Sequence, residues 1–188
     1  MLGELIVGSA GEVPNPKEKA VAYDISDGAF VPSGWMGSAE KASPETLDPK
    51  CSEDPHSLPF CTKITYKAGG VGWAAFAYQF PENNWGDKPG RDLSGKGFTK
   101  VKVWARGATG REVVQFKAGG GTGDGKPHKA SFEVEGDFVR LSKEWKSYTL
   151  AIKGANLSNV VSAFTIAFRE TDNPAGATVY LDDIKYEP

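Results

Sequence analysis

Several features that mark other classes of protein are missing from this sequence. Its 188 residues contain only two cysteines and two histidines, and 22 basic side chains are set against 24 acidic ones, for a net charge of -2. The basic residues are scattered among the acids, so no basic stripe is available for nucleic acid. The longest apolar runs are of strand length, which excludes a membrane-spanning helix. Neither nucleic acid nor a membrane is therefore an expected partner.

Amphipathic helical patterns are also missing. Short segments of alternating apolar and polar residues follow one another instead, separated by turns rich in the 23 glycines and 12 prolines. A chain of this length supports one sizeable core rather than two. We therefore predict an all-β fold, an antiparallel β-sandwich of the jelly-roll type, as a single domain over residues 20–188. Residues 1–19 read as a linker, without the pattern of a signal peptide.

Two segments show the clearest strand pattern. In FTKVKVWARG, residues 98–107, the alternation predicts that Val101 and Val103 face the core. Residues 111–119 alternate in the same way, with Gln115 on the more polar face. Further strands are predicted at residues 20–26, 62–67, 74–80, 132–141, 146–152, 163–169 and 177–187, with one helical turn at 156–162 and a long loop over 38–60.

The two cysteines, Cys51 and Cys61, flank a polar segment rich in turn residues. Such a segment is a poor place to bury a free thiol, so we predict one disulfide between them. Closing this short loop would stabilise the fold by about 2–3 kcal/mol on the chain-entropy argument. A disulfide indicates an exported protein in an oxidising setting. Two cysteines with one histidine between them lack the count and spacing of a zinc site.

The stretch from Val71 to Gly86 ends in an aromatic loop. Its apolar part is followed by Pro81, which withholds an amide donor and ends the strand. Asn83, Asn84 and Trp85 then place two amides beside a flat ring on a surface segment. A pyranose offers C–H groups to such a ring and hydroxyls to such amides. The alternative is that Trp85 plugs one end of the sandwich.

A second aromatic surface is predicted on the polar face of residues 98–107. Trp104 and Arg106 lie side by side there, and a ring beside a guanidinium could hold a sugar or a uronate. The alternative is that a neighbouring loop covers Trp104 while Arg106 pairs with an acid. Trp35, between two glycines, is a further loop aromatic.

Asp182 and Asp183 form an acidic pair inside an otherwise apolar strand. Burial disfavours such a pair unless something compensates it, and calcium, with its preference for oxygen ligands, is a natural compensator. The first and last strands of a jelly roll are often neighbours, so Asp24 or Asp27 could complete the site. The alternative is that both acids are solvated or paired with lysine.

Catalytic residues are harder to place. Both histidines lie in loops, and no serine or cysteine lies in a nucleophile elbow. Glu112, Glu133 and Glu170 are candidates for a glycosidase carboxylate pair, but spacing alone does not distinguish them from solvated acids.

Several segments in order carry a resemblance to a known family. AYDISDG, FVPSGWMG, the two cysteines, GWAAFAYQFPENNWG, KVKVWARG and TVYLDDIKYE together resemble the β-jelly-roll, galactose-binding-like carbohydrate-binding modules attached to bacterial glycoside hydrolases. The resemblance spans residues 20–187. It implies a structural calcium ion held by an acid of the final strand, here Asp182 or Asp183. It also implies a sugar site either on the concave sheet or in loops at the sandwich edge.

We therefore predict a secreted, monomeric, non-catalytic carbohydrate-binding module. The expected ligand is a plant cell-wall polysaccharide, with β-glucan as the first guess from the resemblance, and the expected partner is a parent catalytic domain. The competing classes are a jelly-roll glycanase or lyase and a structural or adhesive domain without a sugar ligand. The predicted sugar-binding residues are Trp35, Trp73, Gln79, Asn83, Asn84, Trp85, Trp104, Arg106, Gln115 and Arg169.

Overall fold

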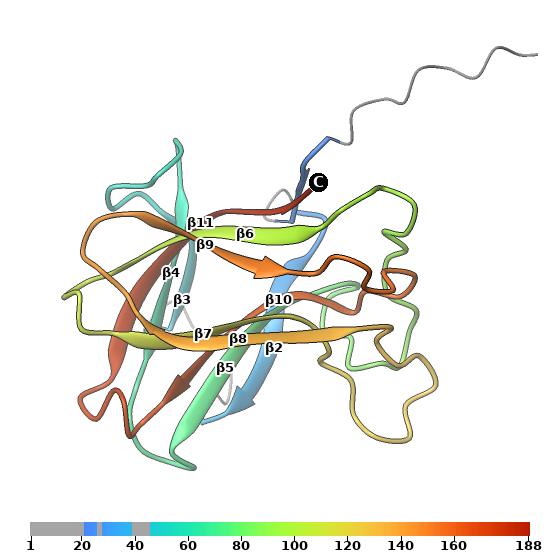
Figure 1. Cartoon of the computed structure of the whole chain (residues 1–188). Coiled ribbons are helices and arrows are strands. Elements are labelled where there is room, and N and C mark those ends of the chain that lie inside the picture. Colours follow the sequence, from blue (N-terminus) through green and yellow to red (C-terminus); the bar gives the residue numbers. More distant parts are fainter. Residues whose placement is uncertain (1–20, 26–27, 39–45) are drawn as a thin grey trace, which may run out of the picture.

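Two antiparallel sheets packed face to face make up the fold (Figure 1). The computed structural model describes residues 21–25, 28–38 and 46–188, so the predicted linker and Asp27 lie outside the described residues. The described residues form eleven strands and no helix. Within them, nothing is helical, long and apolar enough to cross a membrane. The predicted antiparallel β-sandwich is confirmed.

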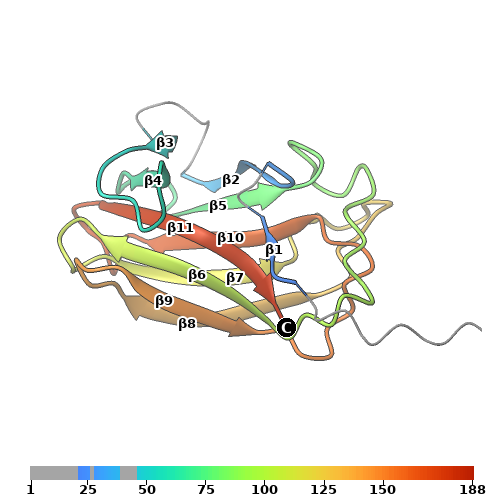
Figure 2. The same ribbon diagram turned by 90° about the horizontal axis from the view of Figure 1, so that it is seen from above.

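Each sheet contains strands from both halves of the chain, and Figure 2 looks onto the faces of the sheets, one lying over the other. Sheet A has the order β3 (Leu47–Cys51), β4 (Cys61–Tyr66), β11 (Ala177–Glu187), β6 (Lys100–Gly107) and β9 (Lys146–Ala151), with β1 (Tyr23–Asp24) also paired to β11. Sheet B has the order β2 (Val31–Gly37), β5 (Trp73–Gln79), β10 (Ser162–Arg169), β7 (Val113–Gly119) and β8 (Glu133–Arg140).

The core lies between the sheets and follows the alternation of the strands. On β6 the side chains of Val101 and Val103 are buried against the other sheet, as the sequence predicts. The first and last strands are neighbours, also as predicted, because Asp24 of β1 is the register partner of Lys185 on β11. Strand β10 is buried along most of its length because it is central in sheet B.

The structure has strands β2 and β3 where the sequence analysis predicts loops. Strand β2 contains Pro32 and two glycines, residues that usually signal a turn. A bulge between Pro32 and Gly34 accommodates them beside β5. A side chain at position 34 would come within 2.8 Å of the Ala77 Cβ, so the close approach needs glycine. The helical turn predicted over residues 156–162 is also wrong, since that segment has no helical residue.

Candidate functional site

A groove lies on the outer face of sheet B, and its floor is built from small side chains. One row of register partners crosses the sheet from β2 to β8: Met36, Ala75, Ala167, Gln115 and Phe138. The alanines in the middle leave space between the larger side chains at the two edges. All five residues line a cavity of about 280 Å³. The groove therefore exists because the central strands carry little side-chain bulk on this face.

Trp73 forms one end of the groove. It begins β5, and 43% of its surface is exposed. Gly37 lies behind it, where an added Cβ would come within 2.8 Å of the indole ring. The ring is thus backed by main chain and open to a ligand on the groove side, where it lines the cavity.

Arg169 stands beside Trp73 as its register partner on β10. Its guanidinium carbon lies 3.5 Å from the centre of the Phe138 ring, and its Nε donates to the Asp172 carboxylate at 2.6 Å. These two contacts hold the guanidinium fork in one place. Arg169 lines the cavity beside Trp73.

Phe138 is a site residue that the sequence reasoning misses, because a bulge decides which way it points. Gln115 and Lys117 of β7 pair with Phe138 and Glu135 of β8, so two residues on β8 oppose one on β7. The extra residue breaks the simple alternation of β8. Phe138 consequently shares the outer face with Glu135, three residues earlier. The glycine at position 136 is the sequence signal for such a bulge.

Polar groups line the middle of the groove. Gln115 Nε2 donates to the carbonyl of Gly136 at 2.9 Å, which orients the side-chain amide. Lys117 and Glu135 form an ion pair with each other across neighbouring strands. Glu133 also lines the groove and is exposed. This arrangement offers hydrogen-bond donors and acceptors with little net charge.

Trp85 lies at the other end of the same groove. It lines a second cavity of about 570 Å³ together with the glycine-rich loop 120–123. Met36, Gly121 and Glu133 line both cavities, so the two join into one groove. Gly121 has φ of 74°, and a Cβ there would meet the Ser162 hydroxyl at 2.1 Å. This glycine-rich loop therefore forms a wall of the groove.

Three of the predicted sugar-binding residues point away from the groove, and these predictions are corrected. Trp35 faces the core, with its ring edge-on to Phe76 at 4.8 Å between centres, because the β2 bulge sets its direction. Gln79 is fully buried and donates to the carbonyl of Asn84 at 2.8 Å. Asn84 is itself buried, and its amide donates to the carbonyls of Phe80 and Lys88.

Asn83 occupies the turn beside Asn84. It is exposed, with φ of 56°, and does not line either cavity of the groove. Its backbone N–H donates to the Ser33 hydroxyl at 2.9 Å. The two asparagines thus shape the loop that presents Trp85. The structure brings together Trp73, Trp85, Gln115 and Arg169 from the predicted set.

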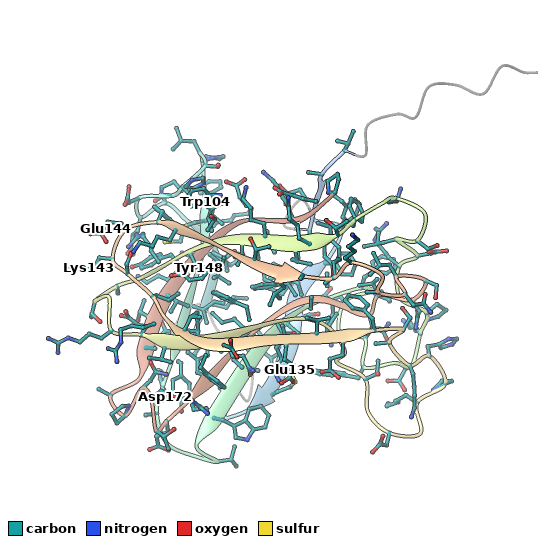
Figure 3. The ribbon with its side chains drawn as sticks, in the orientation of Figure 1. Trp104, Glu135, Lys143, Glu144, Tyr148 and Asp172 are labelled. Atoms are coloured by element: carbon teal, nitrogen blue, oxygen red, sulfur yellow. The ribbon has the colours of Figure 1, made fainter. Side chains whose placement is uncertain are left out.

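Trp104 and Arg106 lie on the outer face of sheet A, on the opposite side of the sandwich from the groove. Figure 3 labels Trp104 and, on the other layer, Glu135 of the groove face. Residues 52–60 form a strap over Trp104, and the His56 ring stacks on it at 3.8 Å between centres with an interplanar angle of 18°. The structure therefore has the alternative arrangement, in which a neighbouring loop covers Trp104.

Further contacts hold this strap in place. Arg106 Nη2 donates to the carbonyl of Glu53 at 2.8 Å, and its guanidinium lies 3.7 Å from the Tyr180 ring centre. Trp145 Nε1 donates to the carbonyl of Asp54 at 2.9 Å. Because the strap covers Trp104 and engages Arg106, the predicted role of this pair in sugar binding is corrected.

Two of the predicted calcium ligands, Asp24 and Asp183, lie around a lysine. Lys185 Nζ is 2.6 Å from Asp183 Oδ1 and 3.7 Å from Asp24 Oδ2. Burial opposes ionisation of Asp183, but hydrogen bonds from Lys185, Ser57 and His56 outweigh it and lower the pKa to about 2. Within the described ranges, no group of three or more His, Cys, Asp or Glu side chains is placed to hold a metal ion.

The carboxylate of Asp182 has different partners from that of Asp183. Its carboxylate accepts hydrogen bonds from the backbone N–H of Ser57 and of Asp183. Burial nevertheless raises its pKa above the usual 3.8. Asp183 is therefore paired with a lysine, whereas Asp182 is held by backbone N–H groups. Since Asp27 lies outside the described part of the chain, the calcium site stays a prediction.

Cys51 and Cys61 are direct register partners on β3 and β4. Both are buried free thiols in this structure, packed beside Tyr180, so the predicted disulfide is not formed here. Burial raises the pKa of the Cys61 thiol to about 12, so the thiol is held protonated. Their juxtaposition on neighbouring strands keeps the disulfide a testable prediction.

The sequence matches no protein-family model and no curated protein. Solved structures, in contrast, resemble it over most of its length. A family 30 carbohydrate-binding module is 20% identical, with a TM-score of 0.59 over 90% of each chain. The family 30 module of a cellulosomal cellulase of Clostridium thermocellum is 18% identical, with a TM-score of 0.57 over 88% of this chain and 96% of that one.

A third structure comes from another module family. The family 11 carbohydrate-binding module from Clostridium thermocellum, in complex with a β-1,3-1,4-mixed-linked tetrasaccharide, is 9% identical. Its TM-score is 0.50 over 76% of this chain and 80% of that one. At these identities the likeness establishes the fold. The chain has the β-jelly-roll fold of carbohydrate-binding modules.

Proposed function

We propose that this chain is a non-catalytic carbohydrate-binding module that binds a linear, neutral polysaccharide in the groove of sheet B. The observation that carries the proposal is an open groove with a tryptophan at each end, Trp73 and Trp85, and polar side chains between them. Flat rings stack on the C–H faces of sugars, while amide and guanidinium groups bind their hydroxyls.

The length of the groove suits several sugar rings in a row. It follows β10 from Arg169 to Thr165 and continues to Gly121, which also lines the cavity of Trp85. The four residue steps from Arg169 to Thr165 span about 13 Å, which is the length of roughly two to three pyranose units, and the second cavity adds to this length. Both cavities are open to solvent along the face, so the bound chain can extend beyond them at either end.

Charge favours a neutral polysaccharide here. Arg169 is paired with Asp172, and Lys117 with Glu135, which leaves Glu133 as the unbalanced group in the groove. A polyanion would therefore meet a slight excess of negative charge. The mixed-linked β-glucan fragment in the family 11 structure supports β-glucan as the ligand class to test first.

The carboxylates considered for catalysis do not form a pair across the groove. Glu112 is buried and accepts hydrogen bonds from the backbone N–H of Thr109 and of Arg111. Glu170 follows β10 and lies near Gly72, while Glu133 stands on β8. Two carboxylates on opposite sides of one scissile bond are what a glycosidase needs. This separation favours binding over hydrolysis.

We also propose that the module works outside the cell. A binding module that acts on cell-wall polysaccharide operates outside the cell and delivers an attached catalytic domain, a glycoside hydrolase, to its substrate. A monomer suffices for that role, since the groove is complete within one chain. The Cys51–Cys61 disulfide would fit the oxidising surroundings.

Affinity electrophoresis tests the function directly. The protein is run through native gels that contain mixed-linkage β-glucan, xyloglucan, mannan or no polysaccharide, and each polysaccharide is also assayed for release of reducing sugar. Retardation by β-glucan without sugar release supports the proposal. Release of reducing sugar would favour the glycanase alternative, and neither effect with any polysaccharide would favour a structural domain.

A further inference from the structure

A wide cleft, separate from the groove, opens at one end of the sandwich. Its volume is about 1130 Å³, and it is bounded by the end of β4, the β6–β7 turn, the end of β8 and the β10–β11 turn. Figure 3 labels Lys143 and Asp172, which lie at this end. The groove residues proposed to hold sugar do not line it, so it is an additional site.

Cations gather at this cleft from two adjoining segments. Arg111 precedes β7, while Arg140 ends β8 and is the register partner of Val113. The backbone N–H of Leu141 donates to the carbonyl of Glu112 at 2.8 Å, which fixes the two segments side by side. Lys143 packs on Gly110, where an added Cβ would lie 3.1 Å from the lysine Cγ. Arg111, Arg140 and Lys143 therefore converge on one opening.

None of these three cations makes a side-chain ion pair within the described part of the chain, although hydrogen bonds, and more weakly the nearby Lys143, lower the pKa of the exposed Glu144 carboxyl. Arg111 and Lys143 make no side-chain ion pair there, and Arg140 Nη1 makes a single contact of 3.5 Å, to the backbone carbonyl of Arg111. All three side chains line the same concave surface. An uncompensated group of cations in one concave site attracts anions.

The two acids of the cleft are committed to other partners. Asp172 is bound to Arg169. Burial opposes ionisation of Glu112, but hydrogen bonds from the backbone N–H groups of Thr109 and Arg111 and from the Thr109 hydroxyl outweigh it and lower the pKa of Glu112. Glu112 is therefore a carboxylate whose oxygens are occupied by the β6–β7 turn. Neither carboxylate is therefore available to pair with Arg111, Arg140 or Lys143.

We propose that this cleft binds the acidic groups, carboxylate or sulfate, of a polysaccharide. The guanidinium forks of Arg111 and Arg140 match the planar or tetrahedral oxygens of such groups, and Lys143 adds a point charge. Thr65 and Thr178, register partners on β4 and β11, supply hydroxyls on the same wall. The choice of a sugar chain as the carrier rests on the proposed function, because Arg169–Asp172 joins this cleft to the groove, so a chain whose neutral part fills the groove can place an acidic group here.

The experiment uses native gels with three sugars: polygalacturonate for carboxylate, dextran sulfate for sulfate, and uncharged dextran. The test variant is R111A/R140A/K143A. The matched control is K88A/K96A/K153A, which also removes three positive charges, but from exposed positions outside the cleft. Wild type and control should be retarded by at least one acidic polysaccharide, and that sugar identifies the group. Exposed ionic contacts are worth about two- to fivefold in affinity each, so the test variant should lose about ten- to hundredfold.

Several outcomes would overturn the inference. Equal retardation of the test variant and wild type, an equal loss in the control, or no retardation by either acidic sugar would each do so. Binding of poly-L-glutamate in place of both acidic sugars would overturn the sugar assignment. Mixed-linkage β-glucan, run alongside, separates this site from the groove: its retardation should persist in the test variant, and failure of β-glucan binding alone leaves the cleft result standing.

Discussion

Replacing Trp73 with alanine is the sharpest test of the groove. The ring is 43% exposed and stands at one end of the groove, backed by the main chain of Gly37. A sugar that stacks on it gains contact on the exposed face only. The loss on substitution can therefore be worked out from the area that the ligand covers.

The magnitude follows from the exposed area. A tryptophan side chain presents up to about 250 Å² to solvent, so Trp73 leaves about 100 Å² uncovered, of which one sugar face covers about half. At about 25 cal/mol per Å², the lost contact amounts to about 1.3 kcal/mol, or about a tenfold weaker affinity. A second ring in contact would raise this figure, and a partly solvated ring would lower it.

Isothermal titration with a β-glucan oligosaccharide measures the change in affinity. The Trp104→Ala variant is the matched control, because that ring lies under His56 on the opposite face and should leave affinity unchanged. Circular dichroism checks that both variants fold. Affinity unchanged in Trp73→Ala, or lost to the same extent in Trp104→Ala, would refute the assignment of the groove.

Three further predictions concern other parts of the fold. If calcium is bound near Asp182 and Asp183, a chelator lowers the melting temperature; an unchanged value with no metal by elemental analysis would contradict the site. If Cys51 and Cys61 form a disulfide outside the cell, protein prepared under oxidising conditions has no titratable thiol and melts at a lower temperature after reduction, whereas two free thiols would speak against it. Glu112→Gln should destabilise the fold at neutral pH by about 1–3 kcal/mol, because a charged acceptor of backbone hydrogen bonds is lost. Since the folded pKa of Glu112 lies below its usual 4.5, this stabilisation is full above that value and fades as pH falls through the folded pKa, so urea titrations of variant and wild type should converge in acid and diverge near neutrality.

Alternation along strands is a sound guide to the core. Period-two patterning places Val101 and Val103 inside, and Gln115 on the outer face of sheet B, because each strand has one face against the other sheet. The pairing of β1 with β11 is also predictable, because the first and last strands of a jelly roll are often neighbours. These predictions rest on local periodicity and a general rule of topology.

Bulges are where the same reasoning fails. Trp35 sits in a glycine- and proline-containing strand whose bulge turns the ring into the core. Phe138 sits beyond a bulge in β8 that turns its ring to the outside. One extra residue reverses every later side chain on a strand, and its position depends on the partner strand. Sequence patterns of one strand do not contain that information.

Contacts between segments far apart in sequence explain why the predicted binding surface around Trp104 is covered in the structure. The strap that covers it is held by contacts between residues far apart in sequence, such as Trp145 with Asp54 and His56 with Asp183. The strap segment is polar and turn-rich, so its composition alone suggests an exposed loop rather than a cover. A strand face with aromatic and basic residues is therefore a binding surface only where no other segment lies across it.

The two outer faces of this sandwich show what decides between a cover and a groove. Sheet A carries large rings and a guanidinium, and these give the strap enough partners to be held down. Sheet B carries alanines in the middle of the face, Ala75 and Ala167, which offer a passing loop little to pack against. Its aromatic rings stand at the ends, where the groove stays open. The small residues thus locate the candidate site as much as Trp73 and Trp85 do, and aromatic content by itself points equally to both faces.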